Sequence, residues 1–242
     1  MLAYLQPDGS VTVYEGLPAP PGTLPANDPN VTYTPVVQPT GALISTAPSA
    51  STVIPSCYYY GTATGLGTSP NDGRCPPLHW VQNKITCINS HTCYKQASQW
   101  VIDHTGAAWP VYAAQNAWEN GSNGSYIANY TTNAASCPSD CVPVTEGNFG
   151  NSGIWQGKCG LTTYTYNSTT HHFGTITVQL NDSCNLTAAQ HRTATCHELG
   201  HALGLNHNRS TDSCLYATID NTLTPDADDF GELNNNNYNH ND

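Results

Sequence analysis

The stretch that decides the fold reads Thr195-Cys-His-Glu-Leu-Gly-His-Ala-Leu-Gly-Leu-Asn-His207. It contains the pattern H-E-x-x-H-x-x-G-x-x-H. On a helix, His197 and His201 are four residues apart and share one face, where two imidazoles can hold one metal ion. Gly204 can adopt a left-handed conformation and end this helix. The chain can then turn back and bring His207 to the same ion.

Three neutral imidazoles leave the fourth position of a tetrahedral zinc ion open, which is typical of catalytic zinc rather than structural zinc. Glu198 follows the first histidine directly and can reach a water molecule at that position without binding the ion. The alternative is a surface helix that carries histidines without a metal, and it is disfavoured because all five fixed positions of the pattern are filled. The sequence therefore predicts a Zn²⁺ site made by His197, His201 and His207, with Glu198 as general base.

The long form of this pattern is the signature of the metzincin zinc peptidases, and the segment resembles that family. The resemblance extends from Trp80 to about Tyr216 and is most specific at the histidine motif. It implies an α+β zincin fold, with a small mixed twisted sheet and two main helices. It also implies an extracellular zinc-dependent endopeptidase that acts on a peptide or protein substrate.

Metzincins carry a methionine turn below the metal, and the segment Ser213-Cys-Leu-Tyr216 lies where that turn is expected. Leu215 then stands in place of the methionine, and Met1 is the only methionine in the chain. Because exchange of Leu and Met nearly conserves volume, we expect the metal site to be retained with modified properties. Tyr216 resembles the residue that forms a wall of the substrate side-chain pocket in the matrixin-like branch of the family.

The same resemblance places the turn below the metal helix, which brings Cys196 and Cys214 together. We expect these two residues to form a disulfide that ties down the loop bearing the third histidine. The alternative is that each pairs elsewhere, for example Cys184 with Cys196.

The composition excludes some partners. The chain has 242 residues, a formal net charge of −11 and only six basic residues. Nucleic acids and anionic membrane surfaces attract basic proteins, so the acidic charge of this chain disfavours both as partners. No apolar run approaches the length needed to span a bilayer.

Ten cysteines in a chain poor in lysine indicate an oxidised, secreted protein. Thiolate ligation of a metal is the alternative, but the Cys137–Cys141 spacing has no second pair to accompany it. Residues 1–8 lack the basic start and apolar core of a secretion signal, so a leader is expected to have been removed or to precede this sequence. Proximity suggests four further disulfides: Cys57–Cys75, Cys87–Cys93, Cys137–Cys141 and Cys159–Cys184.

Prolines recur among Thr, Ser and Ala from residue 17 to residue 55, which excludes a helix and favours an extended linker or disorder. The other interpretations are a propeptide remnant, or an arm through which residues 1–55 mediate self-association. The expected division is a strand-like segment (1–16), an extended linker or arm (17–55), a metzincin-like catalytic domain (56–232) and an Asn-rich tail (233–242).

Local patterns predict the elements of the domain. A helical pattern spans 92–118 in two pieces, because Gly106 and Pro110 interrupt it. The metal helix is expected over 188–203, with a capping box between Thr187 and Gln190. Strands are expected at 79–87, 125–131, 141–145, 161–166 and 175–180.

Two further hypotheses remain open. Asp226, Asp228 and Asp229 could bind Ca²⁺, but their spacing is not that of an EF-hand, and a solvated loop is the simpler interpretation. The protein could also be a catalytically weak or inactive subunit on a metzincin scaffold, secreted as a structural component and joined through its N-terminal arm. The Pro-rich arm and Leu215 favour that reading, whereas an intact Glu198 favours the enzyme.

Overall fold

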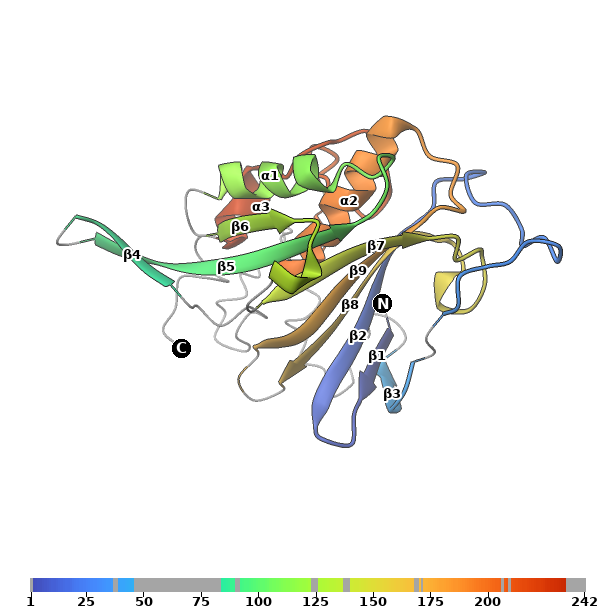
Figure 1. Ribbon diagram of the computed structural model, residues 1–242, viewed down its shortest axis with the longest axis horizontal. Coiled ribbons are helices and arrows are strands. Elements are labelled where there is room, and N and C mark those ends of the chain that lie inside the picture. Colours follow the sequence, from blue (N-terminus) through green and yellow to red (C-terminus); the bar gives the residue numbers. More distant parts are fainter. Residues whose placement is uncertain are drawn as a thin grey trace.

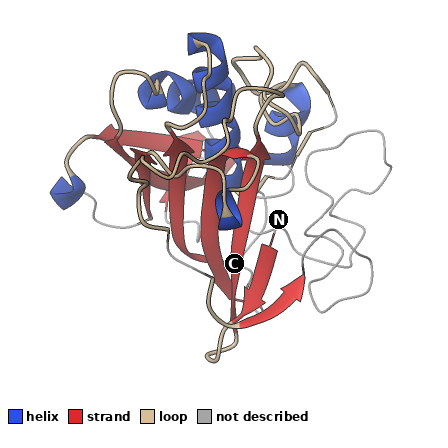
Figure 2. Ribbon diagram, turned by 90° about the vertical axis from the view of Figure 1, so that its right-hand side faces the viewer, coloured by secondary structure: helices blue, strands red, loops and turns tan. Residues whose placement is uncertain are grey.

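The structure is a computed structural model that describes residues 2–36, 39–45, 84–89, 92–122, 126–136, 140–167, 170, 172–205, 207–208 and 210–233. A mixed nine-stranded sheet carries the α-helices on one side (Figures 1 and 2). This arrangement confirms the predicted α+β class. The strands are β1 (Leu2–Leu5), β2 (Ser10–Pro18), β3 (Ala42–Ser45), β4 (Lys84–Asn89), β5 (Thr92–His104), β6 (Tyr126–Thr131), β7 (Cys141–Gly147), β8 (Lys158–Asn167) and β9 (Phe173–Asn181). The helices are α1 (Val111–Gly121), α2 (Ala188–Ala202) and α3 (Ala227–Glu232), with single 3-10 turns at Ala134–Ser136 and Gly153–Trp155.

The strand order is β3-β1-β2-β8-β9-β7-β5-β4, and β6 pairs with β5 beside this path. Three pairs of neighbouring strands are parallel: β5 with β6, β5 with β7, and β7 with β9. Strand β8 is antiparallel to β9, and β2 is antiparallel to β8. The N-terminal strands therefore extend the sheet beyond β8, and β2 comes to lie beside α2.

The helical interpretation of residues 92–104 was wrong, because this segment is strand β5. Val101 and Ile102 are consecutive and both buried, and neighbouring residues of a strand point to opposite faces. A strand covered on both faces has no alternation to reveal it, so a local pattern cannot separate it from a buried helix. The second predicted piece is helical and forms α1.

Helix α2 begins as predicted. The Thr187 side chain accepts from the Gln190 backbone, and the Gln190 side chain accepts from the Thr187 backbone. Helix α1 packs beside it, with Trp118 fully buried and its indole N–H donating to the Cys196 carbonyl at 2.9 Å. The main core fills the space between these helices and the sheet.

A smaller apolar cluster lies on the other face of β8 and is built around Leu161. Phe149 and Trp155 stack there with ring centroids 4.3 Å apart. Tyr14 of β2 packs against the same cluster. Both faces of the β2–β8 pair are therefore covered.

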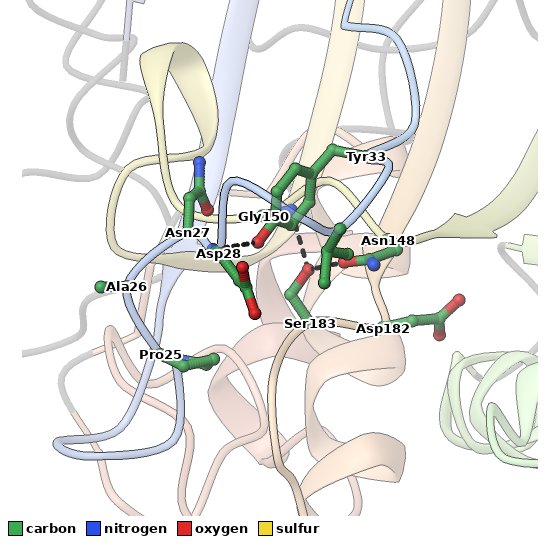
Figure 3. Close-up of a pocket in the computed structure, with 10 residues that line it drawn as sticks. Pro25, Ala26, Asn27, Asp28, Tyr33, Asn148, Gly150, Asp182 and Ser183 are labelled. Atoms are coloured by element: carbon green, nitrogen blue, oxygen red, sulfur yellow. Dashed lines mark hydrogen bonds between the residues drawn. The ribbon is translucent and has the colours of Figure 1, made fainter.

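The Pro-rich segment after β2 packs on the domain over its described part. The Ala19 amide donates to Gly157, and the Asn185 amide donates to the Thr23 carbonyl at 2.7 Å. Further along, the segment around Tyr33 and the loop at Gly150 line a cavity of about 570 Å³ (Figure 3). The hydroxyl of Tyr33 accepts from the Asp28 amide across the segment's own bend.

Strand β2 continues to Pro18, two residues past the predicted end of the strand-like segment. The proposed division of the chain at residues 16, 55 and 232 stays a prediction. The Asn-rich tail from residue 234 onward lies outside the described residues.

Candidate metal centre

Helix α2 and the turn after it bring the three histidines of the motif together. His197 and His201 lie one turn apart on α2, and their ring centroids are 4.6 Å apart. Gly204 has φ +89°, the left-handed conformation expected at the helix end, and the chain reverses there. The ring of His207 then lies 5.0 Å from that of His197 and 5.1 Å from that of His201. One nitrogen from each residue falls within 4.8 Å of the other two.

Backbone carbonyls fix the tautomers of the two helix histidines. Nδ1 of His197 lies 2.9 Å from the Cys214 carbonyl oxygen, and Nδ1 of His201 lies 2.8 Å from that of Leu205. A carbonyl oxygen only accepts, so each Nδ1 carries the proton and each Nε2 presents a lone pair. The two Nε2 atoms face each other at 2.9 Å.

This donor set fits a zinc ion. Two lone pairs at that separation repel each other unless a cation or a proton lies between them. Burial, followed by the charges of His201 and His207, holds the pKa of His197 well below its usual value, and burial lowers the pKa of His207 to about 4. Protonated rings are therefore disfavoured, and a metal ion is the cation that neutral imidazoles accept.

Glu198 lies fully buried between α2 and strand β8. The Thr162 hydroxyl donates to its Oε2 at 2.5 Å, whereas Oε1 has no hydrogen-bond partner among the described residues. Burial raises the pKa of Glu198 to about 8, and the charge of Glu15 adds to that effect. Gly160 makes room for the carboxylate, because a Cβ there would overlap Oε1.

The turn from Ser213 to Tyr216 passes beneath α2. Leu215 is fully buried and contacts the helix where Gly200 has no side chain, so that a Cβ at Gly200 would lie 2.6 Å from a Leu215 methyl group. The Cys196–Cys214 disulfide joins helix and turn directly. Tyr216 is half-buried and forms a parallel bridge with Asn208, the residue after the third histidine.

A buried carboxylate supports this turn from below. Asp229 at the start of α3 accepts from the Asn208 amide at 2.8 Å and from the Ser213 hydroxyl at 2.5 Å. It also forms a reciprocal capping box with Asp226. Two of the three residues of the acidic cluster therefore cap a helix, and calcium binding stays a prediction.

Some residues near Glu198 could not be found from the sequence, because strand register places them there. Thr162, Gly160 and Glu15 carry no motif, and only the pairing of β2 with β8 and the packing of α2 bring them to Glu198. Among the other disulfides, Cys159–Cys184 is formed. The Cys57–Cys75 pair, Cys137 and the side chains of Cys87 and Cys93 lie outside the described residues. No helix in the described ranges is long and apolar enough to cross a membrane.

Comparison with known proteins gives one finding. A family model described as matrixin matches residues 79–236, which is most of the chain and includes the histidine motif and the turn beneath it. The comparison with curated proteins gave no match.

Proposed function

The chain belongs to the matrixin family of zinc metallopeptidases, and from that membership we propose that it is an extracellular endopeptidase using His197, His201 and His207 as zinc ligands and Glu198 as general base. The observation that carries the proposal is the convergence of three imidazole nitrogens next to a helix carboxylate with an unpartnered oxygen. A purely structural metal site has no use for that carboxylate.

A zinc ion held by the three histidines would polarise the scissile carbonyl and lower the pKa of a water molecule. The chain's own residues divide the remaining work. The Cys214 and Leu205 carbonyls hold two imidazoles in the binding tautomer. Thr162 occupies Oε2 of Glu198, which leaves Oε1 to accept the water proton and to return it to the leaving nitrogen. Leu215 supports the helix from below, in the place of the methionine of related enzymes.

The proposed substrates are peptides or proteins, as expected for a protease family. The Cys159–Cys184 and Cys196–Cys214 disulfides support an oxidising, extracellular location. The acidic charge supports the absence of nucleic-acid and membrane partners.

The test compares the parent with Glu198→Gln in hydrolysis of casein, with and without a chelator. The variant should keep its zinc and its fold but lose activity by about three orders of magnitude, because acceptance and return of the proton both fail. Glu119→Gln, a half-buried glutamate of α1 away from the site, is the matched control and should behave as the parent. A Glu198→Gln variant as active as the parent, or activity that resists the chelator, would refute the assignment.

The alternative, an inactive assembly subunit joined through its arm, makes a different prediction in the same assay. No hydrolysis should occur in any variant, and the protein should self-associate through residues 1–55. The docking of residues 19–34 on the protein's own domain gives that alternative less support.

A further inference from the structure

The Pro-rich segment bends over the domain, and this bend encloses one side of a polar cavity (Figure 3). Six of the ten lining residues belong to the bend, residues 25–33, and the other four belong to the loops at 148–150 and 182–183. The cavity volume of about 570 Å³ is typical of small-molecule sites. Because the family match begins at residue 79, the bend that completes the cavity is an addition of this chain to the matched domain.

Hydrogen bonds hold the bend at both of its ends. The Asn151 amide donates to the Asn27 side chain at 2.5 Å, and the Thr34 amide donates to the Asn148 carbonyl at 2.7 Å. Beneath the bend, Gly150 has φ +70°, and a Cβ there would lie 2.6 Å from Oδ1 of Asn27. The bend therefore packs directly on the loop backbone, and both walls of the cavity are fixed.

The cavity presents free hydrogen-bonding groups of both kinds. Asp28 uses Oδ1 within its own turn, and its Oδ2 has no partner among the described residues. Asn148 accepts from the Ser183 hydroxyl through Oδ1, and its NH₂ group has no partner in the same part of the chain. Figure 3 shows these three side chains around one space beside the Tyr33 ring. Val31, which is 41% exposed, adds apolar surface to the same lining.

The lining disfavours three other kinds of ligand. Asp28 and Asp182 are acidic and no lining residue is basic, which disfavours an anion. Among the described residues, only the three motif histidines form a group of three His, Cys, Asp or Glu side chains close enough to share a metal ion. An entirely apolar ligand would leave the free donor and acceptor unpaired. A neutral ligand with hydroxyl groups on an apolar ring skeleton matches every part of the lining.

We propose that the bend and the loops beneath it form a binding site for a neutral saccharide unit. Neighbouring hydroxyl groups of a sugar can donate to the Asp28 carboxylate and accept from the Asn148 amide, because a hydroxyl group does both. The C–H surface of the sugar ring can pack against Tyr33 and Val31. None of the lining residues belongs to the metal centre. The site would therefore hold a polysaccharide, or the glycan of a glycoprotein, on the protein independently of peptide hydrolysis.

Binding of neutral disaccharides tests the site. Cellobiose, maltose, lactose and chitobiose are each titrated into the full-length, zinc-loaded protein and followed by isothermal calorimetry and saturation-transfer NMR. At least one of them should bind saturably with a Kd of about 1 mM or tighter. Absence of saturable binding by all of these sugars would overturn the proposal.

Two nearly isosteric variants locate the binding in the cavity. Asp28→Asn removes the free acceptor and keeps Oδ1 for the turn, whereas Asn148→Asp removes the free donor and keeps Oδ1 for Ser183. Each should weaken sugar binding by about tenfold or more, because one hydroxyl group of the sugar loses its partner. Asp212→Asn and Asn133→Asp make the same exchanges at exposed positions outside the cavity and should bind like the parent. Tighter binding by Asn148→Asp would indicate a cationic ligand and overturn the saccharide assignment.

Gly150→Ala tests whether the bend completes the site. Its Cβ would overlap the Asn27 side chain and displace the bend, so sugar binding should be lost while zinc content is retained. Gly157→Ala is the matched control, because Gly157 also has φ +70° but a Cβ there has no neighbour within 4 Å. Equal sugar binding by these two variants would overturn the role of the bend.

A peptidase assay distinguishes the two sources of the sugar. The substrates are unfolded ribonuclease carrying its N-linked glycan and the same chain without the glycan. A lower KM for the glycosylated form, lost in Asp28→Asn with kcat unchanged, would identify a protein-borne glycan. Equal KM values alongside sugar binding would identify a free polysaccharide. Sugar binding without any hydrolysis would uphold the saccharide site and reject the peptidase, whereas hydrolysis without sugar binding would do the reverse.

Discussion

The Cys196–Cys214 disulfide is expected to act on the metal centre as well as on the stability of the fold. Cys196 precedes the first histidine, and the carbonyl of Cys214 accepts from that histidine's Nδ1. The perturbation is the double replacement Cys196→Ala/Cys214→Ala. The matched control is Cys159→Ala/Cys184→Ala, which removes another buried disulfide, one that joins β8 to the loop before α2.

Loop-closure entropy predicts nearly equal losses of stability. A separation of 18 residues corresponds to about 3 kcal/mol for Cys196–Cys214, and a separation of 25 residues to about 3.5 kcal/mol for Cys159–Cys184. Each double variant removes two buried sulfur atoms, so the packing losses of the two variants are similar. Urea unfolding of the metal-free proteins measures this part.

Zinc affinity should separate the two variants. Loosening the Cys214 carbonyl removes the group that orients His197, and loss of such a partner weakens metal binding by about tenfold or more. The control should retain the parent's affinity. Competition with a chromophoric chelator under conditions where all three proteins are folded gives the comparison. Equal weakening of zinc binding in both variants would refute the idea that the disulfide orients the ligand.

Three shorter predictions address other parts of the site. His201→Ala should bind much less than the one equivalent of zinc per protein expected for the parent, as measured by elemental analysis. Retention of more than about half an equivalent would contradict the role of His201 as a ligand. Leu215→Met should change the free energy of unfolding in urea by less than about 1.5 kcal/mol, because the exchange conserves volume; a larger loss would mean that leucine is specifically required. Burial raises the pKa of Asp229 to about 6, above the usual aspartate value of about 3.9, so the stability associated with its protonated form is present below about pH 4 and is lost as pH rises through 6. Relative to Asp229→Asn, the parent should therefore lose up to about 3 kcal/mol between pH 4 and pH 6 in unfolding titrations, and parallel curves would contradict the raised pKa.

The histidine motif could be predicted from sequence because its parts are local. His197 and His201 are one helical turn apart, and Gly204 ends the helix. Their relative positions therefore follow from helix geometry. The capping box of α2 depends on two residues three apart and was predicted for the same reason. Strand β5 was misassigned because its burial on both faces comes from neighbours distant in sequence.

The surroundings of Glu198 could not be predicted for that same physical reason. Thr162 and Glu15 reach it through β-sheet register, which depends on pairing between segments that are distant in sequence: Glu15 and Tyr164 are 149 residues apart. Leu17 and Pro18 stand in a run of prolines that favours a linker, yet main-chain pairing to β8 outweighs this local tendency.

The same long separation bears on how the molecule is made. Ribosomes deliver β2 well before β8, because the first residue of β8 is the 140th residue after the end of β2. Contacts this distant in sequence form slowly, because a long loop must close before any pairing is gained. During synthesis the β1–β2 hairpin therefore exposes the face that carries Val11 and Val13. An exposed apolar face favours association with other nascent chains. We therefore expect residues 2–18, which contribute no proposed metal ligand, to be the segment that chaperones must protect until β8 has been made.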